Sequence, residues 1–377
     1  MAIYGTRPEA IKMAPIILEL RKSETVDCVV TVTGQHRSML DQVNELFGIT
    51  PDHDLNILQH RQTLNSIMTR TISGLDTLFS GDKPDAVVVQ GDTTTSTAAA
   101  LAAFNHGIRV IHVEAGLRSG NLFSPFPEEA NRRITSQLTS LHLAPTQTSR
   151  DNLLAEGIDA RDIVVTGNSV IDALLTTVRK PVRFTDNRLE ELAASKKRIL
   201  LVTTHRRENQ GDAMRGVGRA LASLADNEPN LTIVLPVHMN PVVREAVLPP
   251  LIGKLNVVVT EPLSYGEFTR LLSLTHVVLT DSGGVQEEAP SLGKPVLVIR
   301  ENTERPEAVD AGTVALVGTD EHVIVAEVRR LLHDEAYYRS MAHAVNPYGD
   351  GKAASRTVAA IESLLAGGRR IDDFASS

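Results

Sequence analysis

The sequence of 377 residues contains one cysteine, no tryptophan and only 3% aromatic residues. The single cysteine, Cys28, excludes an internal disulfide and a zinc site built from several thiolates. It lies in the apolar run 26–33, where a small buried hydrophobic residue is more common than a nucleophile. The scarcity of aromatic residues argues against a surface on which nucleic-acid bases stack.

Long hydrophobic runs are also missing, and no stretch approaches the roughly 20 apolar residues of a membrane-spanning helix. No signal peptide is evident, because Arg7, Glu9 and Lys12 interrupt the apolar residues at the start. We therefore expect a cytoplasmic protein with no membrane partner. The net charge of −8 argues against nucleic acid as a partner, so an anionic ligand must be held by locally placed cations and backbone dipoles.

What the sequence does contain is typical of a globular protein, with 42% hydrophobic and 22% charged residues. Short β-branched runs alternate with amphipathic segments such as 96–105 and 216–224. Most of the short runs are continuously apolar, as expected for strands buried on both faces of a parallel sheet. The predicted strands are 1–4, 29–33, 86–90, 109–113, 141–144 and 163–166, followed by 198–203, 231–236, 257–260, 276–280, 295–300 and 313–316.

This pattern predicts an α/β fold with two Rossmann-like, doubly wound parallel-sheet domains, because the length exceeds one ordinary core. The two series of strands are separated by a stretch that contains Lys180-Pro181 and a charged run. We expect an N-terminal Rossmann-like domain at 1–170, a connecting helix and linker at 171–197, a C-terminal Rossmann-like domain at 198–360 and a tail at 361–377. The C-terminal helix is a candidate for crossing back to the first domain.

Ionisable and small residues follow many of the predicted strands. In open parallel sheets, ligands bind outside the carboxyl ends of the strands, so we predict a site in a cleft between the two domains. The segments that follow the strands are Gly5-Thr6-Arg7-Pro8-Glu9, Gly91-Asp92-Thr93-Thr94-Thr95, Glu114-Ala115-Gly116-Leu117-Arg118, Thr204-His205-Arg206-Arg207-Glu208, Asp281-Ser282-Gly283-Gly284 and Glu301-Asn302-Thr303-Glu304-Arg305.

Two of these segments suit phosphate. Thr6 and Glu9 have the spacing of a capping box, and Arg7 and Lys12 place two cations near the start of the same helix. A plain helix start is the alternative interpretation. The pair Gly283-Gly284 lets backbone N–H groups approach an anion closely, although an ordinary turn is the alternative there.

Glu288 follows the glycine pair and suits sugar hydroxyls better than phosphate, which would repel it. The carboxylates Asp92 and Glu114 each end a buried strand, where a carboxylate is costly unless it is paired or used. Glu128 follows a proline-rich loop, and its alternative interpretation is an ordinary first-turn glutamate. These last three residues are the candidates for proton transfer.

His205 begins a run with Arg206 and Arg207 that suits a diphosphate, the alternative being a structural ion cluster. No Gly-x-Gly-x-x-Gly follows the first strand of either series, so a nicotinamide cofactor is not indicated. We expect neither a cofactor nor a metal.

Taken together, the motifs resemble those of the bacterial non-hydrolysing UDP-N-acetylglucosamine 2-epimerases over nearly the whole chain. The most specific are Gly5-Thr6-Arg7-Pro8-Glu9-Ala10-Ile11-Lys12, Gly91-Asp92-Thr93-Thr94-Thr95, His112-Val113-Glu114-Ala115-Gly116-Leu117-Arg118, Pro127-Glu128-Glu129-Ala130-Asn131-Arg132, His205-Arg206-Arg207-Glu208, Asp281-Ser282-Gly283-Gly284, Gly293-Lys294-Pro295 and Thr303-Glu304-Arg305-Pro306-Glu307.

The resemblance implies a GT-B-type architecture, a homodimer and interconversion of UDP-GlcNAc with UDP-ManNAc. It implies that Asp92, Glu114 and Glu128 are acid/base groups and that His205 assists the departure of UDP. Some members of the family also bind a second UDP-GlcNAc as an activator, but Ser38 replaces a glutamine of those members. The implied substrate-binding residues are Arg7, Lys12, Phe268, Ser282, Gly283, Gly284, Glu288 and Arg305, and the implied activator-binding residues are Gln35, Arg61, Gln62, Arg206 and His238.

Proton removal at C2 of the sugar needs prior cleavage of the bond between C1 and the diphosphate, because no carbonyl is adjacent to C2. Elimination then gives 2-acetamidoglucal and UDP, and re-protonation from the opposite face requires a second acid/base group. Three alternatives are a GT-B glycosyltransferase that uses a UDP-sugar, a hydrolysing epimerase, and an inactive sugar-nucleotide sensor. The sensor is disfavoured because all three candidate carboxylates are present.

Overall fold

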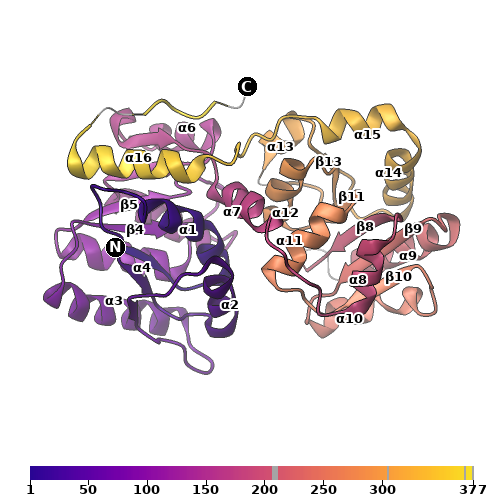
Figure 1. The fold of residues 1–377 in the computed structure, drawn as a ribbon, viewed down its shortest axis with the longest axis horizontal. Coiled ribbons are helices and arrows are strands. Elements are labelled where there is room, and N and C mark those ends of the chain that lie inside the picture. Colours follow the sequence, from indigo (N-terminus) through magenta and orange to yellow (C-terminus); the bar gives the residue numbers. More distant parts are fainter. Residues whose placement is uncertain (206–210, 304, 369–370, 376–377) are drawn as a thin grey trace. The chain divides into compact units, whose positions relative to one another are not determined.

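The computed structural model describes residues 1–205, 211–303, 305–368 and 371–375. The chain forms two compact α/β units (Figure 1). One consists of Met1–Ala173 together with Tyr348–Ser377, and the other consists of Leu174–Pro347. Each unit is built on a single parallel sheet, so the predicted fold class of two doubly wound domains is confirmed.

The first unit contains a seven-stranded parallel sheet in the order β3-β2-β1-β4-β5-β6-β7. Its strands are β1 (Ala2–Tyr4), β2 (Val30–Val32), β3 (His53–Asp54), β4 (Ala86–Gln90), β5 (Arg109–Val113), β6 (Leu141–Ala144) and β7 (Ile163–Val165). Its helices are α1 (Arg7–Leu20), α2 (Arg37–Phe47), α3 (Leu64–Gly81), α4 (Thr94–Asn105), α5 (Glu128–Leu138), α6 (Gln147–Ala155) and α16 (Ala353–Ala366), and α7 (Ser169–Val178) leads into the second unit.

The second unit contains a six-stranded parallel sheet in the order β10-β9-β8-β11-β12-β13. Its strands are β8 (Arg198–Thr203), β9 (Leu231–Pro236), β10 (Val257–Thr260), β11 (Val277–Thr280), β12 (Val296–Val298) and β13 (Val314–Leu316). Its helices are α8 (Asn187–Ala194), α9 (Asp212–Asn227), α10 (Pro241–Val247), α11 (Tyr265–Leu274), α12 (Gly283–Glu288), α13 (Pro306–Asp310), α14 (Glu321–His333) and α15 (Glu335–Ala342).

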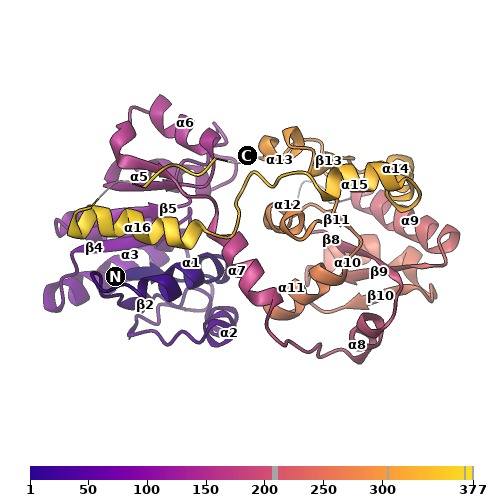
Figure 2. The same ribbon diagram turned by 45° about the horizontal axis from the view of Figure 1, so that its top comes forward.

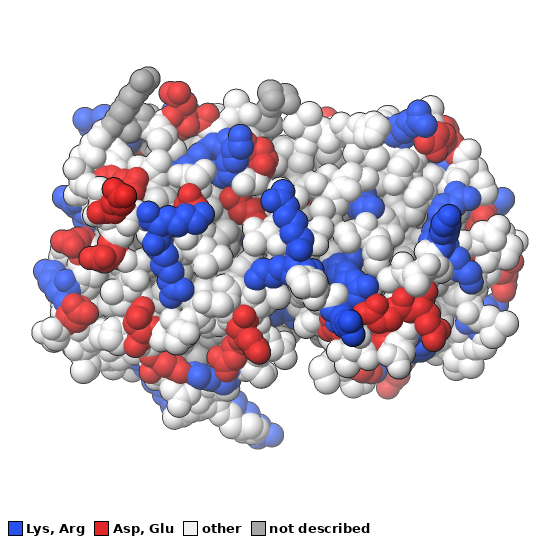
Figure 3. Space-filling view, viewed as in Figure 1, with Lys and Arg blue, Asp and Glu red and all other residues white. Residues whose placement is uncertain are grey.

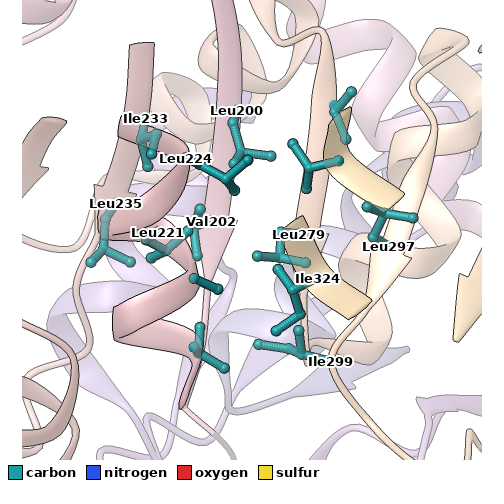
Figure 4. Close-up of a cluster of buried hydrophobic side chains, with 14 of the residues drawn as sticks. Leu200, Val202, Leu221, Leu224, Ile233, Leu235, Leu279, Leu297, Ile299 and Ile324 are labelled. Atoms are coloured by element: carbon teal, nitrogen blue, oxygen red, sulfur yellow. The ribbon is translucent and has the colours of Figure 1, made fainter. Parts of the chain in front are cut away.

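The apolar runs of the sequence correspond closely to these strands. Six predicted strands have the observed bounds, and the others differ by one or two residues at an end. Strand β3 is not among the predictions, because it is a polar, two-residue edge strand. The core of the second unit lies where alternate side chains of the central strands meet helices α9 and α14, and Figure 4 shows part of this cluster, including Leu200, Leu279 and Ile324.

The C-terminal segment belongs to the first unit. The predicted second domain extends to residue 360, whereas in the structure the chain returns to the first unit at Tyr348. Helix α16 lies beside α1, as Figure 1 and Figure 2 both show. The carboxylate of Asp172 accepts hydrogen bonds from the backbone N–H groups of Ala353 and Ala354. Burial raises the pKa of Asp172 to about 6. The start of α16 is therefore held to the first unit by hydrogen bonds to a buried carboxyl group.

Neither positive nor negative side chains dominate the face shown in Figure 3. Figure 3 shows acidic and basic side chains interspersed over the viewed face, in keeping with a modest net charge of −8. Within the part of the chain that the structure describes, no helix is both long and apolar enough to cross a membrane.

The strand order of each sheet fixes where a ligand can bind. In the first unit, the chain reverses its direction of travel across the sheet between β1 and β4, and in the second unit it does so between β8 and β11. The loops that leave two such strands diverge to opposite faces, which opens a crevice at the carboxyl end of the sheet. The polar segments after β1, β4, β8 and β11 are therefore next to these crossover points.

Gly116, in the loop after β5, lies against the backbone of helix α6. Its φ is +94°, and a Cβ there would lie 2.1 Å from the carbonyl oxygen of Ser149. We expect Gly116→Ala to destabilise the protein both by left-handed strain, about 1–2 kcal/mol, and by overlap, about a further 1–3 kcal/mol. The decrease in the free energy of unfolding, measured in urea, gives the sum of the two contributions.

Gly157→Ala is the matched control. Gly157 has a φ of +84°, but no atom lies within 4 Å of the position that its Cβ would take. The Gly157→Ala variant should therefore lose only the stability that corresponds to left-handed strain, about 1–2 kcal/mol. Equal destabilisation by the two substitutions would contradict the proposed close packing at Gly116.

Candidate functional site

A pocket of about 320 Å³ lies at the carboxyl end of the first sheet. Three of its lining residues are the carboxylates proposed from the sequence for proton transfer, namely Asp92, Glu114 and Glu128. They come from three different segments, after β4, after β5 and at the start of α5. The fold therefore brings together in one pocket three acids that are up to 36 positions apart in the sequence, the difference between 128 and 92.

Glu114 is the most firmly held of the three. Nζ of Lys12 lies 2.5 Å from its Oε1 and 2.7 Å from its Oε2. The amide of Asn168 donates to Oε1 at 3.1 Å, and the amide of Gln90 donates to Oε2. Both carboxylate oxygens are thus engaged, and the residue is buried. Its φ of +64° is unusual for a residue with a side chain, so the surrounding contacts hold Glu114 in a strained conformation.

Asp92 is held at one oxygen. Nε and Nη2 of Arg132 both lie 2.8 Å from Oδ2 of Asp92. The amide of Asn131 donates to the backbone carbonyl of Asp92 at 2.9 Å. The ring of His112 contacts the carbonyl of the preceding Gly91, with Nε2 2.7 Å from that oxygen. Burial lowers the pKa of His112 to about 4, so the ring is neutral near pH 7 and Nε2 is the donor.

Glu128 and its neighbour Glu129 have different environments. Oε2 of Glu128 is buried, and no described residue hydrogen-bonds to it. Glu129 is fully buried and accepts the backbone N–H groups of Ser119 and Gly120. Burial alone would raise the pKa of Glu129, but these N–H donors and two arginines hold it below the usual value. Glu129 therefore stabilises the loop, whereas Glu128 lines the pocket.

The helix that follows β1 begins as its sequence predicts. Glu9 accepts the backbone N–H groups of Gly5 and Thr6, which is the glutamate half of a capping box. Arg7 is the first residue of α1. Lys12, one of the two cations proposed for a phosphate, is paired with Glu114.

The other predicted first-unit residues lie along the loops after β2 and β3. Gln35 lines the pocket, and its Oε1 accepts the hydroxyl of Thr95 at 2.8 Å. Gln62 lies nearby, with Nε2 3.5 Å from the carbonyl oxygen of Gln35. Arg61 is exposed with a φ of +55°, and Ser38 is also exposed. Arg206, proposed for the same activator site, lies outside the described residues.

In the second unit, a histidine and a carboxylate meet at the crossover of the sheet. Nδ1 of His205, in the loop after β8, lies 3.0 Å from Oδ1 of Asp281, which directly follows β11. Asp281 is completely buried and also accepts the hydroxyl of Thr204 at 3.1 Å. The ring of His238 stacks against that of His205, with centroids 5.9 Å apart.

The glycine pair begins the short helix α12, after Ser282 at its N-cap. A Cβ at Gly283 would lie 2.4 to 2.9 Å from atoms of the Arg305 guanidinium, so glycine is required there for the arginine to lie against the backbone. Nε of Arg305 lies 2.6 Å from Oε1 of the buried Glu287. Backbone N–H groups and a guanidinium thus lie together, as an anion site requires.

Two further predicted residues lie on α11 and α12. The hydroxyl of Tyr265 donates to Oε1 of the buried Glu288 at 3.0 Å, which fixes that carboxylate at the end of α12. Phe268 lies on α11, partly exposed.

Several residues that shape the two sites are not predicted individually from the sequence. They are the donors and acceptors that hold the predicted groups, namely Gln90, Asn131, Arg132, Asn168, Asp281 and Glu287. Gln90, Asn168 and Asp281 share one signal that could have indicated them, because each lies at or just after the carboxyl end of a strand. The others lie on helices, where no local pattern distinguishes a ligand-facing residue from a solvated one.

Comparison with known proteins gives one consistent result. Residues 18–362 match the family model described as UDP-N-acetylglucosamine 2-epimerase. The UDP-N-acetylglucosamine 2-epimerases of Salmonella typhimurium and Bacillus subtilis are 53% and 52% identical, over 96% and 97% of this chain and 98% and 94% of theirs. A solved UDP-GlcNAc 2-epimerase from Neisseria meningitidis, bound to UDP-GlcNAc, is 48% identical with a TM-score of 0.86, over 97% of this chain and 99% of that one. The chain therefore belongs to the UDP-N-acetylglucosamine 2-epimerase family.

Proposed function

We propose that this protein interconverts UDP-GlcNAc and UDP-ManNAc without net hydrolysis, by eliminating UDP from the sugar and adding it back. The observation that carries the proposal is the gathering of Asp92, Glu114 and Glu128 in one pocket. Inversion at C2 needs a group that removes the C2 proton from one face and a group that returns a proton to the other. A pocket with several acids from different segments supplies groups in different positions.

The three acids differ in how firmly they are held. Both oxygens of Glu114 are engaged by Lys12, Gln90 and Asn168, so we assign it to positioning and electrostatics. Asp92 has one oxygen bound to Arg132, and a carboxylate oxygen of Glu128 is buried with no described partner. We therefore propose Asp92 and Glu128 as the two proton carriers.

The groups of the second unit suit the diphosphate. Negative charge develops on the leaving oxygen as the bond to C1 breaks. His205, Arg305 and the backbone N–H groups of Gly283 and Gly284 are donors or cations near the end of the sheet, with Arg305 held by Glu287. The backbone N–H of Ser282 donates to the hydroxyl of Thr280 at 2.9 Å. Preorganised donors of this kind are worth about 3–4 kcal/mol each in comparable sites. Glu288, held by Tyr265, is proposed to bind ribose hydroxyls.

Two neighbouring activities differ in their products. A glycosyltransferase would need an acceptor and would accumulate a glycoside, and a hydrolysing epimerase would release UDP in proportion to turnover. The relative from Neisseria meningitidis binds UDP-GlcNAc and is named a 2-epimerase, which favours epimerisation of that substrate here. The homodimer, the cytoplasmic location and the activator site at Gln35, Arg61, Gln62, Arg206 and His238 stay predictions.

Turnover of UDP-GlcNAc in D₂O tests the proposed reaction. We expect UDP-ManNAc to form with deuterium at C2, because the C2 proton passes to a side chain that exchanges with solvent. UDP should stay below stoichiometric amounts. Proton NMR of the reaction mixture measures both the deuterium at C2 and the amount of free UDP. Epimerisation with retention of the original C2 hydrogen, or release of one UDP per turnover, would contradict the proposal.

Asp92→Asn tests the assignment of a proton carrier. Because the amide cannot accept a proton, we expect kcat to fall by about 10²–10⁴-fold, whereas the Kd for UDP should stay within about twofold of the wild-type value. Asp76→Asn is a suitable control, since that side chain is 68% exposed on α3, and it should leave both quantities unchanged. Wild-type turnover by the Asp92 variant would remove this residue from the proposed pair.

A further inference from the structure

The hydrogen bonds around Asp281 all converge on one completely buried carboxylate. It accepts from the backbone N–H of His205 at 2.9 and 3.1 Å and from the hydroxyl of Thr204 at 3.1 Å. Its Oδ1 also lies 3.0 Å from Nδ1 of the His205 ring. The side chain of His205, in contrast, is 40% exposed. Asp281 is therefore a fixed acceptor, and the imidazole is the part of the pair that can meet a ligand.

This geometry determines which ring nitrogen is available. A carboxylate only accepts, so Nδ1 of His205 must carry the hydrogen that lies between it and Asp281. Nε2 is then the nitrogen left to face a ligand. The ring of His238, inclined by 30° to that of His205, limits the space into which the imidazole could turn. Both position and tautomer of His205 thus depend on Asp281.

We infer that Asp281 is a positioning residue, which holds His205 so that Nε2 points toward the leaving oxygen of the diphosphate. This inference rests on the proposed elimination of UDP. When the bond between C1 and the diphosphate oxygen breaks, its electron pair goes to that oxygen, and Nε2–H of the imidazolium donates a hydrogen bond to it. The C2 proton goes to the carboxylate base of the proposed elimination. Re-addition of UDP re-forms the bond to C1, while a second acid returns a proton to the opposite face of C2.

The inference has a consequence for pH dependence. Because Nδ1 already carries a hydrogen, Nε2 carries one only when the ring is doubly protonated. A neutral ring therefore offers no N–H to the leaving oxygen, so kcat should be lower at alkaline pH. Two ionisable side chains lie next to the ring, namely the carboxylate of Asp281 and the imidazole of His238.

Asp281→Asn is the direct test. An amide group cannot accept hydrogen bonds at both of its heavy atoms, so the variant should lose the orientation of His205. We expect kcat to fall on the order of 10²-fold or more, as when the orienting carboxylate of a histidine is removed elsewhere, and the alkaline limb of the kcat profile to move to lower pH. The Kd for UDP should change by less than about fivefold.

A matched control and a double variant separate positioning from folding. Asp226→Asn changes a carboxylate of the same unit that is 60% exposed and paired with Lys254, and it should leave the pH profile unchanged. His205→Gln and the double variant with Asp281→Asn should have the same kcat, because residues that act as a unit are not additive. Additive losses, or an unchanged pH profile in Asp281→Asn, would overturn the inference.

The wild-type protein provides a measurement that needs no folded variant. In protein labelled with ¹⁵N at histidine, the His205 signal is identified by its loss in His205→Gln. We expect Nδ1 to stay protonated on both sides of the titration and Nε2 to be the nitrogen that titrates. A neutral ring protonated at Nε2 would refute the role of Asp281. If the wild-type protein did not exchange the C2 hydrogen with solvent, the proposed reaction would be refuted. The protonation of the His205 ring nitrogens would still be measured independently of that outcome.

Discussion

The ion pair between Lys12 and Glu114 is the contact on which the first-unit pocket depends. The two residues are 102 positions apart, and their side chains are 16% and 6% exposed. A carboxylate this deeply buried costs several kcal/mol unless its charge is compensated. Lys12 supplies that charge from α1, while Gln90 and Asn168 bind from the end of β4 and the loop after β7. One carboxylate thus joins four segments and sets the shape of the pocket.

The two sheets use the same topology for opposite electrostatic purposes. At the crossover of the first sheet, the loops present carboxylates, of which Asp92 is an example. At the crossover of the second sheet, the loops present a histidine, glycine N–H groups and Arg305. Acids suit the transfer of a proton, and donors suit the charge of a departing diphosphate. Two sheets with the same kind of crossover therefore present the two kinds of groups that the proposed elimination needs.

Most of the fold could be predicted from the sequence, because buried parallel strands are continuously apolar and are followed by recognisable turns. The exceptions have physical causes. Strand β3 is too short and polar to produce a signal, and the return of the chain at Tyr348 depends on a buried contact between Asp172 and the start of α16. The candidate acids could be predicted by residue type and place, since each follows a strand or begins a helix beside the sheet edge.

The partners of those acids could not be predicted, and the partners are what distinguish them. The sequence shows that Asp92 and Glu114 each end a buried strand and that Glu128 follows a proline-rich loop, but it does not show what each carboxylate contacts. In the folded chain, one has both oxygens occupied, one has a single oxygen held by Arg132, and one has a buried oxygen that no described residue binds. The proposal of Asp92 and Glu128 as the proton carriers rests on this difference, because the protein's own hydrogen bonds engage both oxygens of Glu114 but not both oxygens of the other two acids.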